Sequence, residues 1–157
     1  MNRAHARSRR TAATDPGIIE AVRSQLPGTL CSRMNMELLD LSAEGGVIRM
    51  PVAGNTQPAG LLHGGASIAL AETVASLAAF VHARTIHGDG ATAVGVDVSA
   101  THHRSARSGE VIATATARHL GKQLASYLVE VTDKRKHLLC TCTVTTMLLP
   151  PRAAETA

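Results

Sequence analysis

One carboxylate, Glu72, interrupts a run of residues that otherwise suits a protein interior. It is the only residue with a formal charge between positions 64 and 83, and no Lys or Arg lies within one helical turn of it. Burying such a charge without a partner is costly. Two hypotheses follow: Glu72 reaches the rim of the domain or an arginine from elsewhere, or it is a base or nucleophile in a partly dry cleft. Ser76, on the same helix face, can orient that carboxylate or a water, or bond back to its own helix.

The residues that precede the apolar run can also do chemistry. Gly64 and Gly65 would place backbone N–H groups at a helix N-terminus, where they can bind developing negative charge as an oxyanion hole must. A glycine pair also suits a tight turn from loop to helix. His63 and Gln57 stand just before the pair, where each can contact a ligand or simply hold the loop.

The spacing along this helix limits how these groups can meet. Glu72 comes eight residues after Gly64, which is about 12 Å along a helix at about 1.5 Å per residue. One chain cannot easily bring both groups to a single carbonyl. Two copies of the helix, antiparallel across a two-fold axis, would bring the N-terminus of one to the middle of the other. We therefore expect an obligatory homodimer with shared active sites.

The remaining sequence predicts the elements that position this helix. A short amphipathic helix is expected at residues 16–26, after an N-cap at Thr14 or Asp15, and a hairpin from strands at 34–41 and 46–52. The longest helix covers about 65–83 and ends by Gly88. After it the period changes from helical to alternating, which predicts four strands near 94–99, 111–118, 127–132 and 138–145. Short loops at 105–109, 120–123 and 133–136 favour antiparallel neighbours.

Each of these four strands is expected to turn one face inward and one outward. By alternation, Val94, Val96 and Val98 share a face, and Leu138 shares a face with Cys140. A helix that is apolar on nearly every side cannot lie half-exposed on a flat sheet. We therefore expect an α+β architecture of the hotdog type, with the sheet curled around the helix and an uncovered edge closed by a partner chain.

Length and charge limit the organisation of the chain. Its 157 residues suit one domain, expected at 14–149, with a disordered basic tail at 1–13 and a C-terminal tail at 150–157. The formal net charge is +4, but much of the excess lies in the first ten residues and would not form a folded basic face. This distribution weakens a nucleic-acid hypothesis.

Three cysteines, an odd count without CxxC spacing, indicate neither a disulfide framework nor a zinc site. His102 and His103 are adjacent on an expected strand and would face opposite sides, so they do not indicate a metal site. No metal or cofactor is expected.

The N-terminus lacks an apolar signal region, and no stretch reaches roughly 18 uninterrupted apolar residues. A cytoplasmic protein without a membrane span is the expectation.

The stretch QPAGLLHGGASIALAETVAS at 57–76 closely resembles the signature of hotdog acyl-CoA thioesterases of the 4-hydroxybenzoyl-CoA and phenylacetate-degradation type, including the 1,4-dihydroxy-2-naphthoyl-CoA hydrolases. GVDVSATHHRSARSGEV and the HLG turn also match, and a weaker resemblance runs from about 30 to 149. The resemblance implies hydrolysis of an acyl-CoA thioester, with Glu72 as nucleophile or general base. It further implies that the Gly64 N–H polarises the carbonyl, that His63 and Gln57 position it or the water, and that Ser76 assists Glu72.

The resemblance also implies a partner arrangement and a coenzyme A site. Glu72 and Ser76 would come from one subunit and the other three residues from its neighbour, in dimers that usually pair again into tetramers. Candidates for the coenzyme A site, which would contact the phosphates through cationic loops, are Arg104, Arg107, Gly121 and Lys122. The chain departs from the pattern at Thr101, where many relatives have Asn, and at Gln123 and Leu124, where they have Ser or Thr.

Besides thioester hydrolysis, the sequence leaves two other functions open. A hotdog hydratase would add water to an enoyl thioester, but it would use an Asp–His pair, which the Glu72 motif does not resemble. A non-catalytic hotdog domain would bind acyl-CoA as a sensor. For a thioesterase, the acyl group can be aromatic or medium-chain, and the carrier can be coenzyme A or an acyl-carrier protein.

Overall fold

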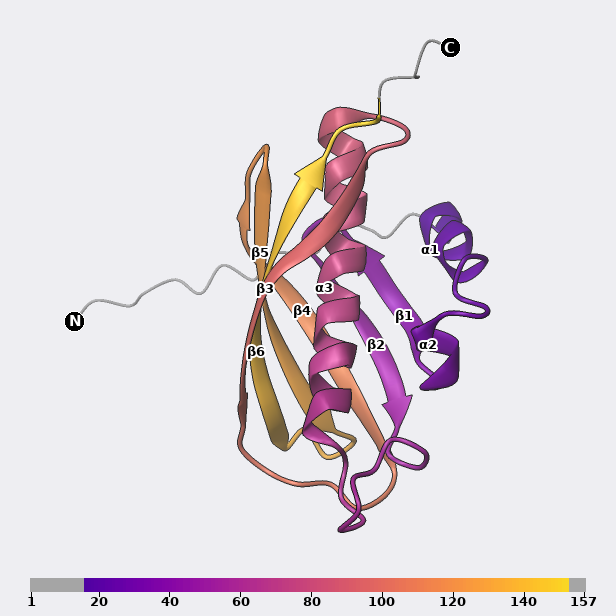
Figure 1. Ribbon diagram of the computed structural model, residues 1–157, viewed down its shortest axis with the longest axis vertical. Helices are drawn as coiled ribbons and strands as arrows, with labels where there is room; N and C mark the ends of the chain where they lie inside the picture. Colours follow the sequence, from indigo (N-terminus) through magenta and orange to yellow (C-terminus); the bar gives the residue numbers. More distant parts are fainter. Residues whose placement is uncertain (1–15, 153–157) are drawn as a thin grey trace, which may run out of the picture.

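Helix α3 (Gly64–His87) runs along the hollow of a curled antiparallel sheet in the computed structural model, which describes residues 16–152 (Figure 1). The sheet contains β1 (Glu37–Ser42), β2 (Gly45–Pro51), β3 (Thr92–His102), β4 (Glu110–Leu120), β5 (Leu124–Asp133) and β6 (Leu138–Leu149). Two short helices, α1 (Pro16–Arg23) and α2 (Leu30–Arg33), precede it. The predicted tail at 1–13, the N-cap at Thr14 or Asp15, and residues 153–157 lie outside the described residues.

The strand order is β1-β2-β4-β5-β6-β3, with every neighbouring pair antiparallel. The predicted hairpin and the three-strand meander β4–β6 are both present. Because α3 carries the chain across the concave face before β3 begins, β3 pairs with the last strand, β6. The prediction that the loop at 105–109 joins antiparallel neighbours was therefore wrong, since β3 and β4 do not pair. β1 and β3 are therefore the two edges of the sheet. The predicted hotdog architecture is confirmed, whereas α2 was not predicted.

Alanine lets α3 approach the sheet closely. Its buried side includes Leu70, Val74 and Ala78, which recur every four residues and are all fully inaccessible to solvent. By length and composition α3 could cross a membrane, since an 18-residue window has a mean hydropathy of 1.5. The strands that it packs against account for this apolar character, because half of that window is buried within the domain.

Tyr127 is the largest fully buried side chain, and it ties the centre of β5 to the β1–β2 hairpin. Its hydroxyl donates a 2.9 Å hydrogen bond to the carbonyl of Ala43. Burial raises the pKa of the phenol, so the hydroxyl keeps its proton and remains a donor. The inward face of β5 continues with Val129 and Val131, as the alternating pattern predicted.

Strand β3 departs from the predicted alternation. A bulge between Gly95 and Asp97 inserts one residue, so that Val94 turns to the outer face while Val98 turns inward. Val94 and Val96 are 43% and 51% exposed, and the prediction that they share a face with Val98 was wrong. An edge strand accommodates such a bulge readily, because the bulge disrupts hydrogen bonds to only one neighbour.

A second irregularity lies at the start of β6. The register between β5 and β6 shifts at Val131 and Thr132, which places Leu139 inside and leaves Leu138 exposed. The prediction that Leu138 shares the buried face of Cys140 was therefore wrong. From Cys140 onward the alternation holds.

The cysteines are free, and two of them occupy the sheet interior. The sulfurs of Cys140 and Cys142 are 3.6 Å apart on the inward face of β6. Burial raises the pKa of both thiols, that of Cys142 to about 12. They remain protonated at neutral pH, as expected for small buried hydrophobic residues.

We predict that Tyr127→Phe lowers the free energy of unfolding by about 1–2 kcal/mol, because the Ala43 carbonyl loses its buried donor. Urea denaturation measures the change. The control is Ser24→Ala, which removes an exposed hydroxyl bonded to the carbonyl of Ala21 at the end of α1 and is expected to stay within about 0.5 kcal/mol of the native protein. Equal effects of the two substitutions would contradict this account of the tyrosine.

Candidate active site

His63 caps the N-terminus of α3. Its Nδ1 accepts a 2.8 Å hydrogen bond from the N–H of Gly65, and its carbonyl accepts from Ala66 and Ser67. With Nδ1 as acceptor, the neutral imidazole carries its proton on Nε2, which remains able to donate. His63 therefore holds the loop against the helix end, which was one of its two predicted roles. This role uses only Nδ1, so contact with a ligand would fall to Nε2.

These bonds leave one backbone donor at the helix end. Among residues 16–152, the N–H of Gly64 has no acceptor, whereas the next three N–H groups all bond to His63. A helix N-terminus favours negative charge at such a donor. A Cβ at position 64 would lie 2.9 Å from Nε2 of His102, so a larger residue there would displace that imidazole.

A cavity of about 540 Å³ opens in front of this helix end. Gln57, His63, Gly64, His102 and Arg104 all contribute to its walls. The structure thus brings together three of the predicted catalytic residues and one predicted coenzyme A residue. The loop that carries Gln57 is closed by a bridge between residues 56 and 62, which fixes it beside the helix end.

His102 is a residue that the sequence did not single out for catalysis. It was considered only as half of a metal pair with its neighbour His103. The structure separates the two, because His103 bonds to Thr141 while His102 lies against Gly64 in the cavity. What identifies His102 as a site residue is the contact between β3 and the start of α3. That contact forms only in the folded chain, so the sequence alone could not reveal it.

Glu72 lies outside that cavity, on the open side of α3 toward β3. Its Oε1 would be 2.8 Å from a Cβ on Gly95, so the carboxylate rests directly over the glycine backbone. Glu72 is exposed, and within residues 16–152 it forms no ion pair. In a single chain, therefore, it occupies the rim. Ser76, one turn later, is half-buried.

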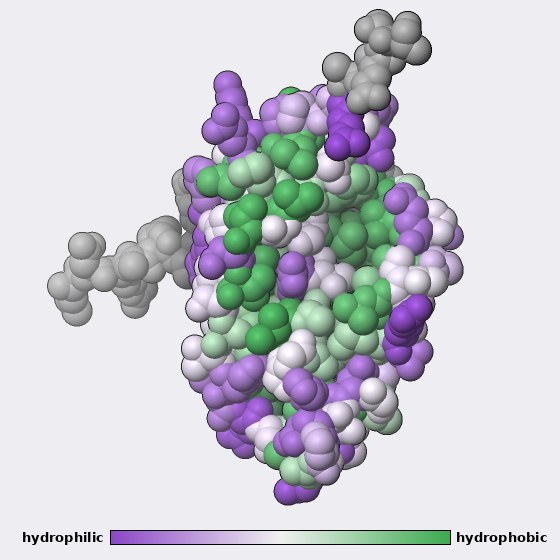
Figure 2. Space-filling view, viewed as in Figure 1, coloured by the Kyte–Doolittle hydropathy of each residue, from purple (hydrophilic) through white to green (hydrophobic). Residues whose placement is uncertain are grey.

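The face that carries Glu72 also carries apolar surface. Figure 2, in the view of Figure 1, shows hydrophobic side chains gathered along β3 beside α3. The exposed large hydrophobic residues of β3 and its neighbour β6 are Val94, Val96, Leu138 and Met147, and Val94 lies on the outer face of the sheet. Among residues 16–152, one side of β3 has no strand partner.

The four predicted coenzyme A residues do not form one cluster within the chain. Arg104 lies at the cavity, and Arg107 is exposed farther along the same loop. Gly121 and Lys122 form the β4–β5 turn at the opposite end of the molecule (Figure 1).

Two histidines of α3 hold that turn. Nε2 of His82 lies 2.9 Å from the Gly121 carbonyl, and Nε2 of His87 lies 2.8 Å from that of Lys122. Both partners are acceptors, so both nitrogens donate. These histidines lie about 30 Å along the helix from its N-terminus, which separates Lys122 from Arg104 in one chain.

Comparison with known proteins identifies the family of this chain. Residues 59–140 match the thioesterase superfamily. The chain belongs to this superfamily. A proofreading thioesterase, EntH of Cronobacter turicensis, is 36% identical over 132 residues, which cover 83% of this chain and 93% of the relative. Named thioesterases recur among the similar structures, and the chain is a thioester hydrolase.

Solved thioesterase structures share the hotdog fold described above. Thioesterase HI1161 from Haemophilus influenzae superposes with a TM-score of 0.79 at 30% identity, covering 87% of this chain and 94% of its own. SAV0944 from Staphylococcus aureus was solved with a glutamine and, separately, a glutamate fifteen positions later replaced by alanine. Its TM-scores are 0.69 and 0.71 at 33% identity, covering 77% and 78% of this chain and 98% and 99% of its own.

Taking Glu72 as the catalytic carboxylate that the sequence predicts, we expect Gly95→Ala to lower thioester turnover by about 10²-fold, because the new methyl group displaces that carboxylate. The free energy of unfolding should change by less than about 1 kcal/mol, since the flexible glutamate can move away. Thiol release and urea denaturation measure the two effects. Ser99→Ala, an exposed position of the same strand, is the control and should keep native turnover. Native turnover in Gly95→Ala would contradict this position for the carboxylate.

Proposed function

We propose that the chain hydrolyses acyl-CoA thioesters at sites shared across a homodimer, with Glu72 as nucleophile or general base and the Gly64 N–H as oxyanion donor. The observation that carries this proposal is the division of the candidate residues. Gln57, His63 and Gly64 share a cavity that Glu72 does not line. A second copy supplies the missing group to each half.

The edge of the sheet supports this assembly. Within the described part of the chain, β3 lacks a strand partner on one side and exposes Val94 and Val96. An apolar edge of this kind favours pairing with another strand. Pairing of two β3 edges about a two-fold axis would extend the sheet and cover the open side of α3. Glu72 would then lie in the partly dry cleft that makes a carboxylate an effective base. We further propose that two such dimers associate into a tetramer.

The remaining residues have roles that their hydrogen bonds allow. The thioester carbonyl oxygen would accept from the Gly64 N–H, with the Nε2–H of His63 as a further donor and the imidazole of His102 beside it. Oε1 of Gln57 accepts from Ala59 at 3.0 Å, which leaves its amide N–H groups to orient the carbonyl or the water.

The chemistry has two forms that share these residues. Glu72 either attacks the carbonyl carbon, expelling the thiolate and forming an anhydride that water opens, or takes a proton from a water that attacks directly. Both routes consume one water and release the acid and the thiol. Ser76, four residues after Glu72, would orient that carboxylate or the water.

The comparisons give one further support for these roles. The glutamine and glutamate replaced in SAV0944 are fifteen positions apart, and Gln57 and Glu72 have the same separation. The cationic Arg104 at the cavity suits a phosphate of coenzyme A. Lys122 and Gly121 lie at the opposite end of the molecule from Arg104. They would therefore contribute to a coenzyme A site from the other subunit. Three free cysteines favour the reducing cytoplasm as the location.

We predict that Glu72→Gln lowers kcat for acyl-CoA hydrolysis by about 10²–10⁴-fold and leaves acyl-CoA affinity near the native value, because the amide can neither attack nor accept a proton. Thiol release with a colorimetric reagent measures turnover, and calorimetry measures binding. The control is Glu130→Gln at an exposed position, which should keep native turnover. A Glu72→Gln protein with native turnover would exclude the proposed role. Binding without turnover in the native protein would instead indicate an acyl-CoA sensor.

A further inference from the structure

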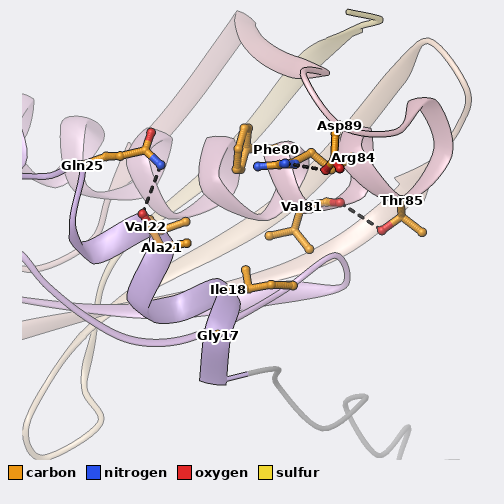
Figure 3. Close-up of a pocket in the computed structure, with 10 residues that line it drawn as sticks. All are labelled: Gly17, Ile18, Ala21, Val22, Gln25, Phe80, Val81, Arg84, Thr85 and Asp89. Atoms are coloured by element: carbon orange, nitrogen blue, oxygen red, sulfur yellow. Dashed lines mark hydrogen bonds and ion pairs between the residues drawn. The ribbon is translucent and has the colours of Figure 1, made fainter.

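A second cavity lies between α1 and the C-terminal half of α3. Its volume is about 400 Å³, and Figure 3 shows the side chains of both helices that line it. Ile18 and Val22 come from α1, and Phe80 and Val81 come from α3. The cavity thus has an apolar lining and a size within the range of small-molecule sites.

The neutral polar side chains of this cavity each bond to the backbone carbonyl four residues earlier in the chain. Nε2 of Gln25 donates to the carbonyl of Ala21 at 3.1 Å, and the hydroxyl of Thr85 donates to the carbonyl of Val81 at 3.0 Å (Figure 3). A ligand is therefore not needed to satisfy either group. A site that recognised a polar group would instead present unpaired donors or acceptors.

The charged side chains of the cavity also satisfy one another. Arg84 donates to Asp89 at 2.5 Å, and its guanidinium carbon lies 5.5 Å from the centroid of the Phe80 ring (Figure 3). With its charge paired and one face against the ring, Arg84 acts as part of the wall. The cavity therefore favours an uncharged hydrocarbon.

The position of the cavity relative to Glu72 sets the length of such a group. Ser76 and Phe80 follow Glu72 at intervals of four residues, so all three lie along neighbouring turns on the open side of α3. Phe80 is about 12 Å along the axis from Glu72. Carbon–carbon bonds of about 1.52 Å advance an extended chain by about 1.3 Å each, so roughly nine or ten carbons cover the distance.

We propose that the cavity between α1 and α3 binds the distal end of the acyl group, and that the substrate carries a straight aliphatic chain of roughly eight to twelve carbons. This inference rests on the proposed function, because it takes Glu72 as the reaction centre. An aryl group attached directly to the thioester carbonyl ends well before Phe80 and leaves the cavity unused.

The test measures thiol release from butyryl-, hexanoyl-, octanoyl-, decanoyl- and benzoyl-CoA. Ala21 is exposed at the cavity wall, so Ala21→Phe fills the cavity from α1. Thr85→Phe fills it from α3 and serves as a second variant should the first disturb α1. Ser24→Phe adds the same ring to an exposed position that does not line the cavity.

Burial of each methylene group raises kcat/KM by up to roughly fourfold. The native protein and Ser24→Phe should therefore prefer decanoyl-CoA to butyryl-CoA. Both cavity-filling variants should lower the ratio of kcat/KM for decanoyl-CoA to kcat/KM for butyryl-CoA at least about tenfold. An unchanged ratio in both variants, or a native preference for benzoyl-CoA, would overturn the assignment of the cavity while leaving a hydrolase that needs Glu72. No thiol release from any thioester would overturn the proposed function itself and this inference with it.

Discussion

The position of Glu72 on the stripe of α3 that its own sheet leaves uncovered governs the rest of the site. The helix has to be apolar toward the sheet, and Leu70, Val74 and Ala78 meet that requirement. Glu72 faces the other way and rests over Gly95 of the edge strand β3. A carboxylate so placed is solvated in one chain and becomes enclosed only when something covers both the helix stripe and the edge.

The glycines and the cap of α3 serve the same arrangement. Gly95 leaves room for the carboxylate, and Gly64 leaves room for His102, so in each case a missing side chain lets a side chain of the proposed site approach the backbone. His63 binds the next three N–H groups and leaves that of Gly64 without an acceptor in the described residues. Stability of the helix end and readiness to bind a developing oxyanion therefore depend on the same hydrogen bonds.

Much of this could be predicted from the sequence because hydrophobic period and turn residues report local structure directly. The hairpin, the long helix, the meander and the isolated Glu72 all follow from such local patterns. The bulge in β3 could not be predicted, because one inserted residue depends on which strand is the edge. The place of His102 and the cavity between α1 and α3 depend on contacts between segments distant in sequence. The separation of Lys122 from Arg104 likewise required the strand order.

The most direct test of a shared active site is intersubunit complementation. Glu72→Gln and His63→Asn, in which Asn can still cap the helix, are each expected to be nearly inactive. Dimers containing one subunit of each kind are purified through two different tags, and their thiol release is measured. Each mixed dimer holds one site with a native glutamate and a native histidine, so turnover should return to about half the native value per dimer. Mixed dimers as inactive as their parents would contradict the account, because each site would then lie within a single chain.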